Sequence, residues 1–324
     1  MSKQAHLNSA GVNKAEDTDS ATKKGTIWKI DRNATHDGPG IRTLLYFKSC
    51  PLRCHWCSNP EGQLADPVLI FQPAKCNNCG LCIDACPRQA LTLPKPARVR
   101  IDRSKCDVYC GECVPACPTV ALQIWGQRYS VPEVVELLER DRLIHRKSGG
   151  GLSCTGGEPL AQGEFLLGLL DQCRRQGIHT SVETSAYADK VLFKAMLQLV
   201  EWLFIDLKHM NPQKHLELTG KSNDIILRNT RLASTILQTR GKALVIRQVV
   251  IPNITDGQNI TDLADFATSL PFVSGVELLT YHNYGSHKYN LLNRKYGLQE
   301  VTPPTAEEMV KYKKVLQDKG LTVI

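Results

Sequence analysis

The feature that constrains this chain most is a loop of three closely spaced cysteines. Cys50, Cys54 and Cys57 follow a C-x3-C-x2-C pattern, and the next cysteine is Cys76. A 4Fe–4S cluster normally binds four thiolates, one at each iron. Three thiolates leave one iron without a protein ligand, and an open coordination position is where a metal centre meets its substrate. The loop therefore predicts a reactive iron–sulfur cluster rather than a purely structural one.

Cysteine usage along the whole chain favours metal over disulfides. The 324 residues include 13 cysteines, an odd number, and most of them stand in tight C-x2-C steps. Residues 1–24 are polar and are expected to form a disordered tail. No apolar run approaches membrane-spanning length. We expect a cytoplasmic protein without a membrane partner, in a cell with little oxygen, because exposed clusters oxidise.

Outside the cysteine-rich segment, short β-branched runs alternate with helical patterns. Thr305 and Glu308 predict a capping box at the start of the last helix. Six βα units predict parallel strands closed into a partial (β/α)6 barrel, with the site residues at the strand C-termini. The predicted strands are 42–47, 152–155, 180–184, 202–207, 244–251 and 276–281, and the clearest helices are 131–144, 163–176, 189–200 and 305–320.

Residues 66–125 break this alternation and contain eight cysteines in two similar halves. Residues 76–87 follow C-x2-C-x2-C-x3-C-P, and residues 106–118 follow C-x3-C-x2-C-x3-C-P. The duplication resembles a bacterial two-cluster ferredoxin, in which the fourth cysteine of each half ligates the other cluster. The resemblance implies an inserted ferredoxin-like domain with two 4Fe–4S clusters. The expected ligand sets are Cys76, Cys79, Cys82 and Cys117 for one cluster, and Cys106, Cys110, Cys113 and Cys86 for the other.

Two points qualify this interpretation. The extra residue between Cys106 and Cys110 departs from the usual ferredoxin spacing. Structural zinc sites are the alternative, because four cysteines per half would also serve zinc.

Three clusters would also change the net charge. The formal value is +8 with cysteine counted as neutral, and eleven bound thiolates with three cluster cores would reduce it to roughly +3. We therefore expect no nucleic-acid partner.

The order and content of five segments resemble the activating enzymes of glycyl radical enzymes, a branch of the radical S-adenosylmethionine (SAM) superfamily. The resemblance covers residues 25–324, which are expected to form the radical SAM core around the insert, and it matches the longer members that carry such an insert. The segments are DGPGIRTLLYFKSCPLRCHWCSNPE (37–61), SGGGLSCTGGEPL (148–160), IHTSVETSAY (178–187), FIDLKHMN (204–211) and LLTYHNYGSHKYNLL (278–292).

The resemblance implies a mechanism and its partners. SAM would chelate the open iron of the Cys50, Cys54 and Cys57 cluster. One electron, delivered by flavodoxin or ferredoxin, would break SAM into methionine and a 5′-deoxyadenosyl radical. The radical would remove a Cα hydrogen from one glycine in the C-terminal loop of a partner glycyl radical enzyme, where no side chain hinders access.

The same resemblance assigns roles to individual residues. Lys208 is expected to pair with the SAM carboxylate, and Asp37 and Arg247 are expected to hold the partner's glycine loop. Glu183, Thr184 and Asp206 resemble the ligands of a monovalent cation beside that carboxylate. The residues expected to contact SAM are Trp56, Cys57, Ser58, Gly156, Gly157, Glu158, Glu183, Asp206, Leu207, Lys208 and His282.

Two segments depart from the family pattern, and one further cysteine lies outside it. Simpler activators carry Asp-Thr-Asn-Gly where this chain has Glu-Thr-Ser-Ala from Glu183, so the cation ligand is one methylene longer. Cys154 stands where hydroxyl residues are more usual, and it is either a thiol near the site or a small buried strand residue. Cys173 lies in an amphipathic helix and is expected to pack.

Other interpretations use the same residues differently. Asp206 and Lys208 could form a structural ion pair, and His282 could be a hydrogen-bonded structural histidine. A radical SAM enzyme that modifies peptides is the alternative function, although such enzymes tend to place extra cysteines after the barrel, whereas here none follows Cys173. A ferredoxin-like electron carrier would need neither the three-cysteine loop nor the barrel.

Overall fold

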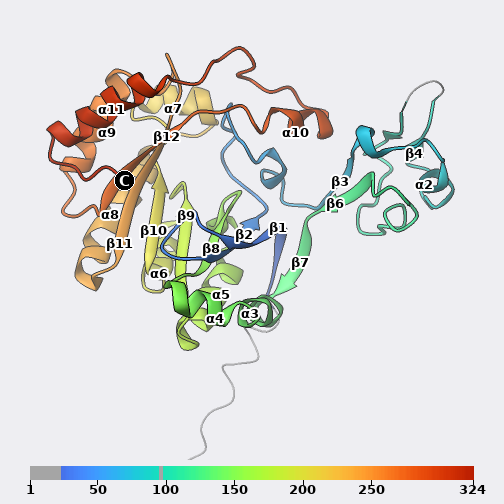
Figure 1. Ribbon diagram of the computed structural model, residues 1–324, viewed down its shortest axis with the longest axis horizontal. Helices are drawn as coiled ribbons and strands as arrows, with labels where there is room; N and C mark the ends of the chain where they lie inside the picture. Colours follow the sequence, from blue (N-terminus) through green and yellow to red (C-terminus); the bar gives the residue numbers. More distant parts are fainter. Residues whose placement is uncertain (1–22, 95–97) are drawn as a thin grey trace, which may run out of the picture.

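The computed structural model describes residues 23–94 and 98–324, and a curved, open sheet of eight strands forms its centre (Figure 1). The strand order is β12-β11-β10-β9-β8-β2-β1-β7. The strands are β1 (Lys24–Ala34), β2 (Arg42–Phe47), β7 (Gln127–Ser130), β8 (Gly151–Gly156), β9 (His179–Thr184), β10 (Trp202–Asp206), β11 (Ala243–Val250) and β12 (Gly275–Thr280).

The six predicted strands are confirmed as one parallel set. β2 and β8 to β12 pair in parallel with their neighbours, so their C-terminal ends meet at one edge. Two further strands were not predicted: β1 pairs antiparallel with both β2 and β7. Because Lys24 already belongs to β1, the boundary predicted for the polar tail is corrected by one residue. Residues 1–22 of that tail lie outside the described residues.

Helices pack on the outer face of the sheet (Figure 1). The predicted helix 131–144 is instead two helices, because Asp141 lies between them and accepts hydrogen bonds from Arg32 and Thr43. The capping box of Thr305 and Glu308 is confirmed. The helices are α3 (Val131–Glu139), α4 (Arg142–Ser148), α5 (Gly163–Arg175), α6 (Lys190–Leu197), α7 (Pro212–Thr219), α8 (Asp224–Arg240), α9 (Gln258–Thr268), α10 (Ser286–Leu291) and α11 (Ala306–Asp318).

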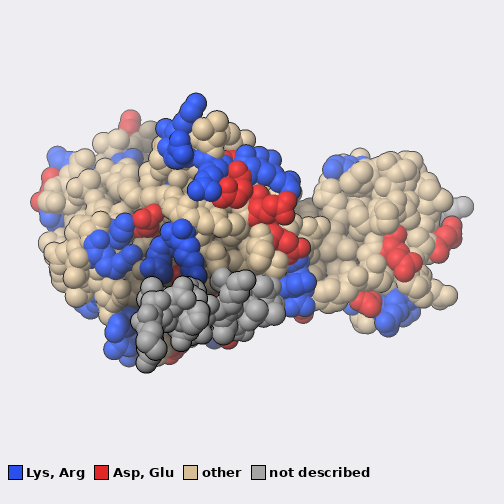
Figure 2. All heavy atoms as spheres, turned by 90° about the horizontal axis from the view of Figure 1, so that it is seen from below, with Lys and Arg blue, Asp and Glu red and all other residues tan. Residues whose placement is uncertain are grey.

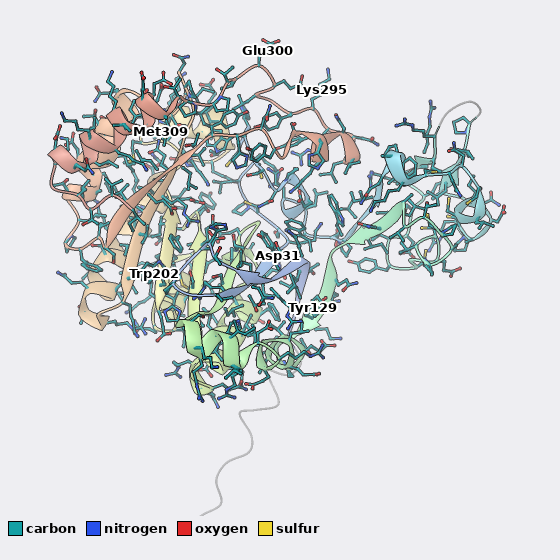
Figure 3. All side chains as sticks on the ribbon, in the orientation of Figure 1. Asp31, Tyr129, Trp202, Lys295, Glu300 and Met309 are labelled. Atoms are coloured by element: carbon teal, nitrogen blue, oxygen red, sulfur yellow. The ribbon has the colours of Figure 1, made fainter. Side chains whose placement is uncertain are left out.

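One apolar core lies between the sheet and these helices. It joins buried strand residues such as Leu203 and Leu244 to helix residues such as Leu169 and Leu237. Cys154 and Cys173 are both fully buried in this core, so Cys154 is a packing residue of β8 and not a thiol of the cleft. Figure 3 shows Lys295 and Glu300 on the segment between α10 and α11, which passes over the C-terminal side of the sheet.

The cysteine-rich segment forms a smaller lobe beside the barrel (Figure 2). It is joined by a two-stranded antiparallel ribbon of β3 (Val68–Phe71) and β6 (Leu122–Trp125). Beyond the ribbon lie the short pair β4 (Leu91–Thr92) and β5 (Arg100–Ile101) and one helical turn, α2 (Leu81–Asp84). Within the described residues, no helix has the length and apolar character needed to cross a membrane.

Candidate active site

The C-terminal ends of the parallel strands open into a cleft of about 190 Å³. Most of the residues predicted from sequence to form the site line it, together with Val249, Leu279 and Tyr281, which were not predicted. These three are apolar or aromatic residues near the ends of β11 and β12, so the strand-end rule could have found them. The predicted residues that line the cleft are Cys50, Cys54, Trp56, Cys57, Ser58, Gly156, Gly157, Glu183, Thr184, Asp206, Lys208 and His282.

The three cysteines lie on a loop between β2 and the short helix η1 (Pro60–Gly62). Backbone hydrogen bonds hold the loop: the Arg53 N–H donates to the Thr219 carbonyl at 2.7 Å, and the Cys57 N–H donates to the Cys54 carbonyl at 3.2 Å. Burial raises the pKa of all three thiols, that of Cys54 to about 12. Thiolates at these positions therefore need a positive charge to stabilise them, which an iron–sulfur core supplies.

Gly156 and Gly157 allow the turn after β8 to approach the cysteine loop. A Cβ on Gly157 would lie 2.4 Å from the carbonyl oxygens of both Ser49 and Gly62. Gly156 has a φ of +107°, and a Cβ there would lie 2.6 Å from the Phe47 nitrogen. Since the Gly157 N–H donates to the Phe47 carbonyl at 2.8 Å, both glycines are required by close backbone packing.

Glu158 lies behind the turn rather than in the cleft. Its side chain is 1% exposed and accepts hydrogen bonds from the Thr184 hydroxyl at 2.6 Å, the Ser185 hydroxyl at 2.6 Å and the Ser185 N–H at 2.8 Å. Burial raises the pKa of this carboxyl, and the hydrogen bonds from Ser185 and Thr184 oppose the rise. Glu158 therefore ties the glycine turn to the end of β9, which places it as a shaping residue of the site.

Asp206 and Lys208 form an ion pair at the end of β10, with 2.8 Å between Nζ and Oδ2. Burial lowers the pKa of Lys208, but the negative charges of Asp206, Cys54 and Glu183 together raise it above its ordinary value. Lys208 is thus a stable cation beside the cysteine loop. The side chain of Leu207, in contrast, is buried in the main core, and this residue does not line the cleft.

Arg247 of β11 gathers three carboxylates beside the cleft; of this group only Glu183 lines the cleft itself. Its guanidinium lies 2.7 Å from Glu277, 2.9 Å from Asp37 and 3.4 Å from Glu183, and it covers the ring of Phe204. Asp37 and Arg247, predicted together from sequence, are therefore in direct contact. Sequence reasoning missed Glu277. The available signal was a lone charged residue within an apolar strand run, and the structure places it opposite Arg247 in the β11–β12 register.

Glu183 connects this group to the cleft. It accepts a hydrogen bond from the Thr155 hydroxyl at 2.6 Å. Burial raises its pKa to about 7; Arg247 opposes the rise, and Asp37 and Asp206 add to it. The Thr184 hydroxyl donates to Glu158 and accepts from the Ala186 N–H, which leaves one lone pair for another partner. The carboxylates here outnumber the cations, so added positive charge would be favourable.

Aromatic residues form the opposite wall. Trp56 is 6% exposed and packs with Tyr281 and Tyr289. The exposed ring of His282 stacks on Tyr284 at 4.4 Å between centroids. The cysteine loop is held here by α10, because the Tyr289 hydroxyl donates to the Cys57 carbonyl at 3.0 Å.

Lys288, the neighbour of Tyr289, holds the residues that follow Cys57 in the same loop. Its ammonium donates to the Ser58 carbonyl at 3.0 Å, to Asn59 at 3.2 Å and to Glu61 at 2.6 Å. Sequence reasoning missed Lys288 and Tyr289 as functional residues, although both lie inside a matched segment.

In the insert, the cysteines that interact electrostatically are those of the swapped ligand sets. Burial raises the pKa of Cys82, and the further contributions come from Cys117, Cys76 and Cys79. Burial raises the pKa of Cys113 to about 11, with further contributions from Cys106, Cys86 and Cys110. Across residues 23–94 and 98–324, no three His, Cys, Asp or Glu side chains converge closely enough to hold one metal ion. A 4Fe–4S cluster instead spreads its four thiolates around a cube, one at each iron.

Comparisons with known proteins identify the family of this chain. Residues 44–267 match the Radical SAM superfamily. The chain is 34% identical to the trans-4-hydroxy-L-proline dehydratase activating enzyme of Clostridioides difficile, over 90% of this chain and 95% of that protein. It is 38% identical to the isethionate sulfite-lyase activating enzyme of Nitratidesulfovibrio vulgaris, over 86% and 91%. It is 35% identical to the indoleacetate decarboxylase activating enzyme of Tractidigestivibacter scatoligenes, over 93% and 97%. The chain therefore belongs to the radical SAM superfamily and, within it, to the activating enzymes of glycyl radical enzymes.

Proposed function

We propose that this chain installs a glycyl radical on a partner enzyme, using the cleft at the ends of β8 to β12. When bound, the 4Fe–4S cluster supplies one electron to SAM, which splits into methionine and a 5′-deoxyadenosyl radical that takes a Cα hydrogen from the partner's glycine. The chain's own residues hold the cofactors, place SAM and receive the partner's loop. We place this activity in the cytoplasm under anaerobic conditions.

Cys50, Cys54 and Cys57 would hold the cluster, and their neighbours would orient SAM. Lys208 offers a fixed cation for the SAM carboxylate, since Asp206 and Cys54 keep it charged. Trp56 and His282 form the aromatic side of the cleft, which Ser58 also lines, and this side fits the adenine end of SAM. The glycine turn sits directly against the cysteine loop, so backbone groups rather than side chains would face the SAM amino group.

A monovalent cation fits beside Glu183 and Asp206. Both carboxylates line the cleft and interact with each other, and the Thr184 hydroxyl keeps a free lone pair. The raised pKa of Glu183 reflects burial and negative charge that Arg247 does not fully balance. A bound cation would keep Glu183 ionised at neutral pH and would offset repulsion of the SAM carboxylate.

Asp37 would meet the partner's glycine loop, with Arg247 as its support. Arg247 is 5% exposed and already pairs with Asp37, Glu183 and Glu277. It is therefore better placed to fix those carboxylates than to bind the loop itself. Asp37 has a φ of +64°, and its carboxylate keeps its second oxygen for a backbone N–H of an incoming loop.

The insert would hold two further 4Fe–4S clusters and receive electrons from flavodoxin or ferredoxin. The electrostatic grouping of Cys82 with Cys117 and of Cys113 with Cys86 supports the swapped ligand sets. The apolar cluster that contains these thiols would shield the cubes from water.

The observation that carries the proposed function is the convergence of three thiols, Lys208 and the glycine turn on one cleft. The test is anaerobic incubation of the iron-loaded protein with SAM, dithionite and a candidate glycyl radical enzyme. We expect a glycine-centred doublet in the electron paramagnetic resonance spectrum and one 5′-deoxyadenosine per radical. Cys54→Ser is the control without the site-bound cluster. An intact cluster that cleaves SAM but transfers no radical to any such enzyme would favour the peptide-modifying alternative.

A further inference from the structure

A basic groove lies between the insert and α10, outside the cleft. It encloses about 780 Å³ and is lined on the insert side by Arg98, Arg100 and Arg103 and on the barrel side by Leu291. Figure 1 shows α10 extending from the barrel toward the insert at this point. The described lining residues include no acidic side chain, so the groove has a single sign of charge.

Two of the three arginines are available to a partner. Arg98 and Arg100 are exposed, and within residues 23–94 and 98–324 neither guanidinium has a hydrogen-bond or ion-pair partner. Arg103 differs, because it donates to the Leu69 carbonyl at 3.1 Å and to the Leu291 carbonyl at 3.4 Å. Arg103 therefore bridges the two walls, while Arg98 and Arg100 present unpaired charge at the opening.

The apolar floor of the groove is also the wall of the cysteine core. Phe71, Val99 and Ile101 line the groove, and all three belong to the apolar cluster that contains Cys82 and Cys113. The groove and the thiols of the insert therefore border the same apolar cluster. The other wall, α10, carries Lys288 and Tyr289, which hold the loop of Cys50, Cys54 and Cys57.

We propose that this groove docks an acidic one-electron donor protein. Carboxylates of the donor would meet Arg98 and Arg100, and an apolar edge beside its redox cofactor would cover the floor at Phe71 and Ile101. The inference rests on the proposed function, in which each SAM cleaved consumes one electron. The donor's reduced cofactor is oxidised by one electron, and one oxidised cluster of the insert is reduced by it.

The donor fits the groove better than the glycyl radical enzyme does. The partner's glycine loop has to reach the cleft at the ends of β8 to β12, which Asp37 and Arg247 flank. The groove lies on the insert side of α10 and is lined by none of the cleft residues. Charge at such a rim mainly raises the association rate, and its effect weakens as salt rises.

The test measures SAM cleavage in the full chain carrying its clusters, with reduced flavodoxin or with dithionite as electron source. The variant is Arg98→Glu with Arg100→Glu. The matched control is Lys311→Glu with Lys314→Glu, which makes the same charge change at exposed positions of α11. At low ionic strength we expect the groove variant to raise the KM for flavodoxin about tenfold or more with little change in kcat. The control should change the KM for flavodoxin less than about twofold, and high salt should bring the KM of the groove variant back to that of the unmodified protein.

Dithionite separates this proposal from the proposed function. Dithionite needs no docking surface, so the groove variant should cleave SAM with it at the unmodified rate, which also shows that the variant is folded. If the glutamate variant does not fold, Arg98→Gln with Arg100→Gln should also raise the KM for flavodoxin, by a smaller factor. An unchanged KM for flavodoxin at low salt would overturn the proposal, as would normal flavodoxin kinetics with impaired radical transfer to the glycyl radical enzyme. Absence of dithionite-driven cleavage in the unmodified protein would instead contradict the proposed function.

Discussion

In the barrel the polar side chains around the cleft have partners within the protein, whereas most thiols of the insert lie in an apolar cluster. Glu158, Arg247 and Lys288 each make several hydrogen bonds or ion pairs within the barrel. Among its described residues, the insert has strands of two to four residues, one four-residue α-helix and one three-residue 3-10 helix, Pro73–Lys75. The barrel is thus organised by its own side chains, while the insert would gain most of its internal connections from the clusters that we propose for it.

The largest expected effect comes from removing all iron under anaerobic conditions. Amides of the insert should exchange with solvent close to the unfolded rate, while those of β8 to β12 should stay protected by at least about 10³-fold. The measurement is hydrogen–deuterium exchange followed by peptide mass spectrometry, with the iron-loaded protein as control. Equal protection of both regions without iron would break the comparison.

Lys288→Ala tests whether the barrel itself holds the cysteine loop. The variant leaves Glu61, which is fully buried, without its ammonium partner. Breaking a buried pair on one side typically costs about 3–5 kcal/mol, and the partial exposure of Lys288 places the expected loss of unfolding free energy near 3 kcal/mol. Urea denaturation followed by tryptophan fluorescence measures it. Lys288→Met combined with Glu61→Gln should recover part of the loss, because no carboxylate remains without its ammonium, although the buried ammonium of Lys48 loses the negative charge of Glu61. A loss below about 0.5 kcal/mol for Lys288→Ala would refute the role.

Glu158→Ala should destabilise the barrel by about 2 kcal/mol, because the buried hydroxyls of Thr184 and Ser185 lose their acceptor. The visible absorbance of clusters in the insert should not change. Glu158→Gln keeps one acceptor oxygen and should cost less than half as much. If the alanine variant unfolds at the same urea concentration as the unmodified protein, the turn is held by backbone packing alone.

The smallest expected effect concerns pH. Glu183 has a folded-state pKa of about 7, above its ordinary value of 4.5. The folded chain therefore binds this proton more tightly, and the associated stability is present below about pH 4.5 and is lost as pH rises to about 7. Glu183→Gln should lose about 1 kcal/mol less stability between pH 6 and pH 7 than the unmodified SAM-free protein. Glu112→Gln, an exposed position of the insert, is the charge-matched control. Identical pH slopes for all three proteins would exclude the raised pKa.

The predictions that the structure confirms rest on local sequence patterns. Runs such as 202–207 are buried on both faces, so periodicity and composition identified them as strands, and the strand-end rule located Asp206, Lys208 and His282. β1 was missed because it alternates buried and exposed residues unevenly and ends in a polar stretch. The partners of Glu158, 26 and 27 residues away, depend on how β8 and β9 meet, which no local pattern encodes.

The ribbon of β3 and β6 has a consequence for how such a chain can change over time. Val68 and Trp125 face each other across it, so the two ends of the insert leave the barrel side by side. Opposed residues of an antiparallel pair lie only about 5 Å apart, a gap that a tight turn spans. A gene could therefore acquire or discard the whole lobe in a single event, and the remaining strands would keep their register.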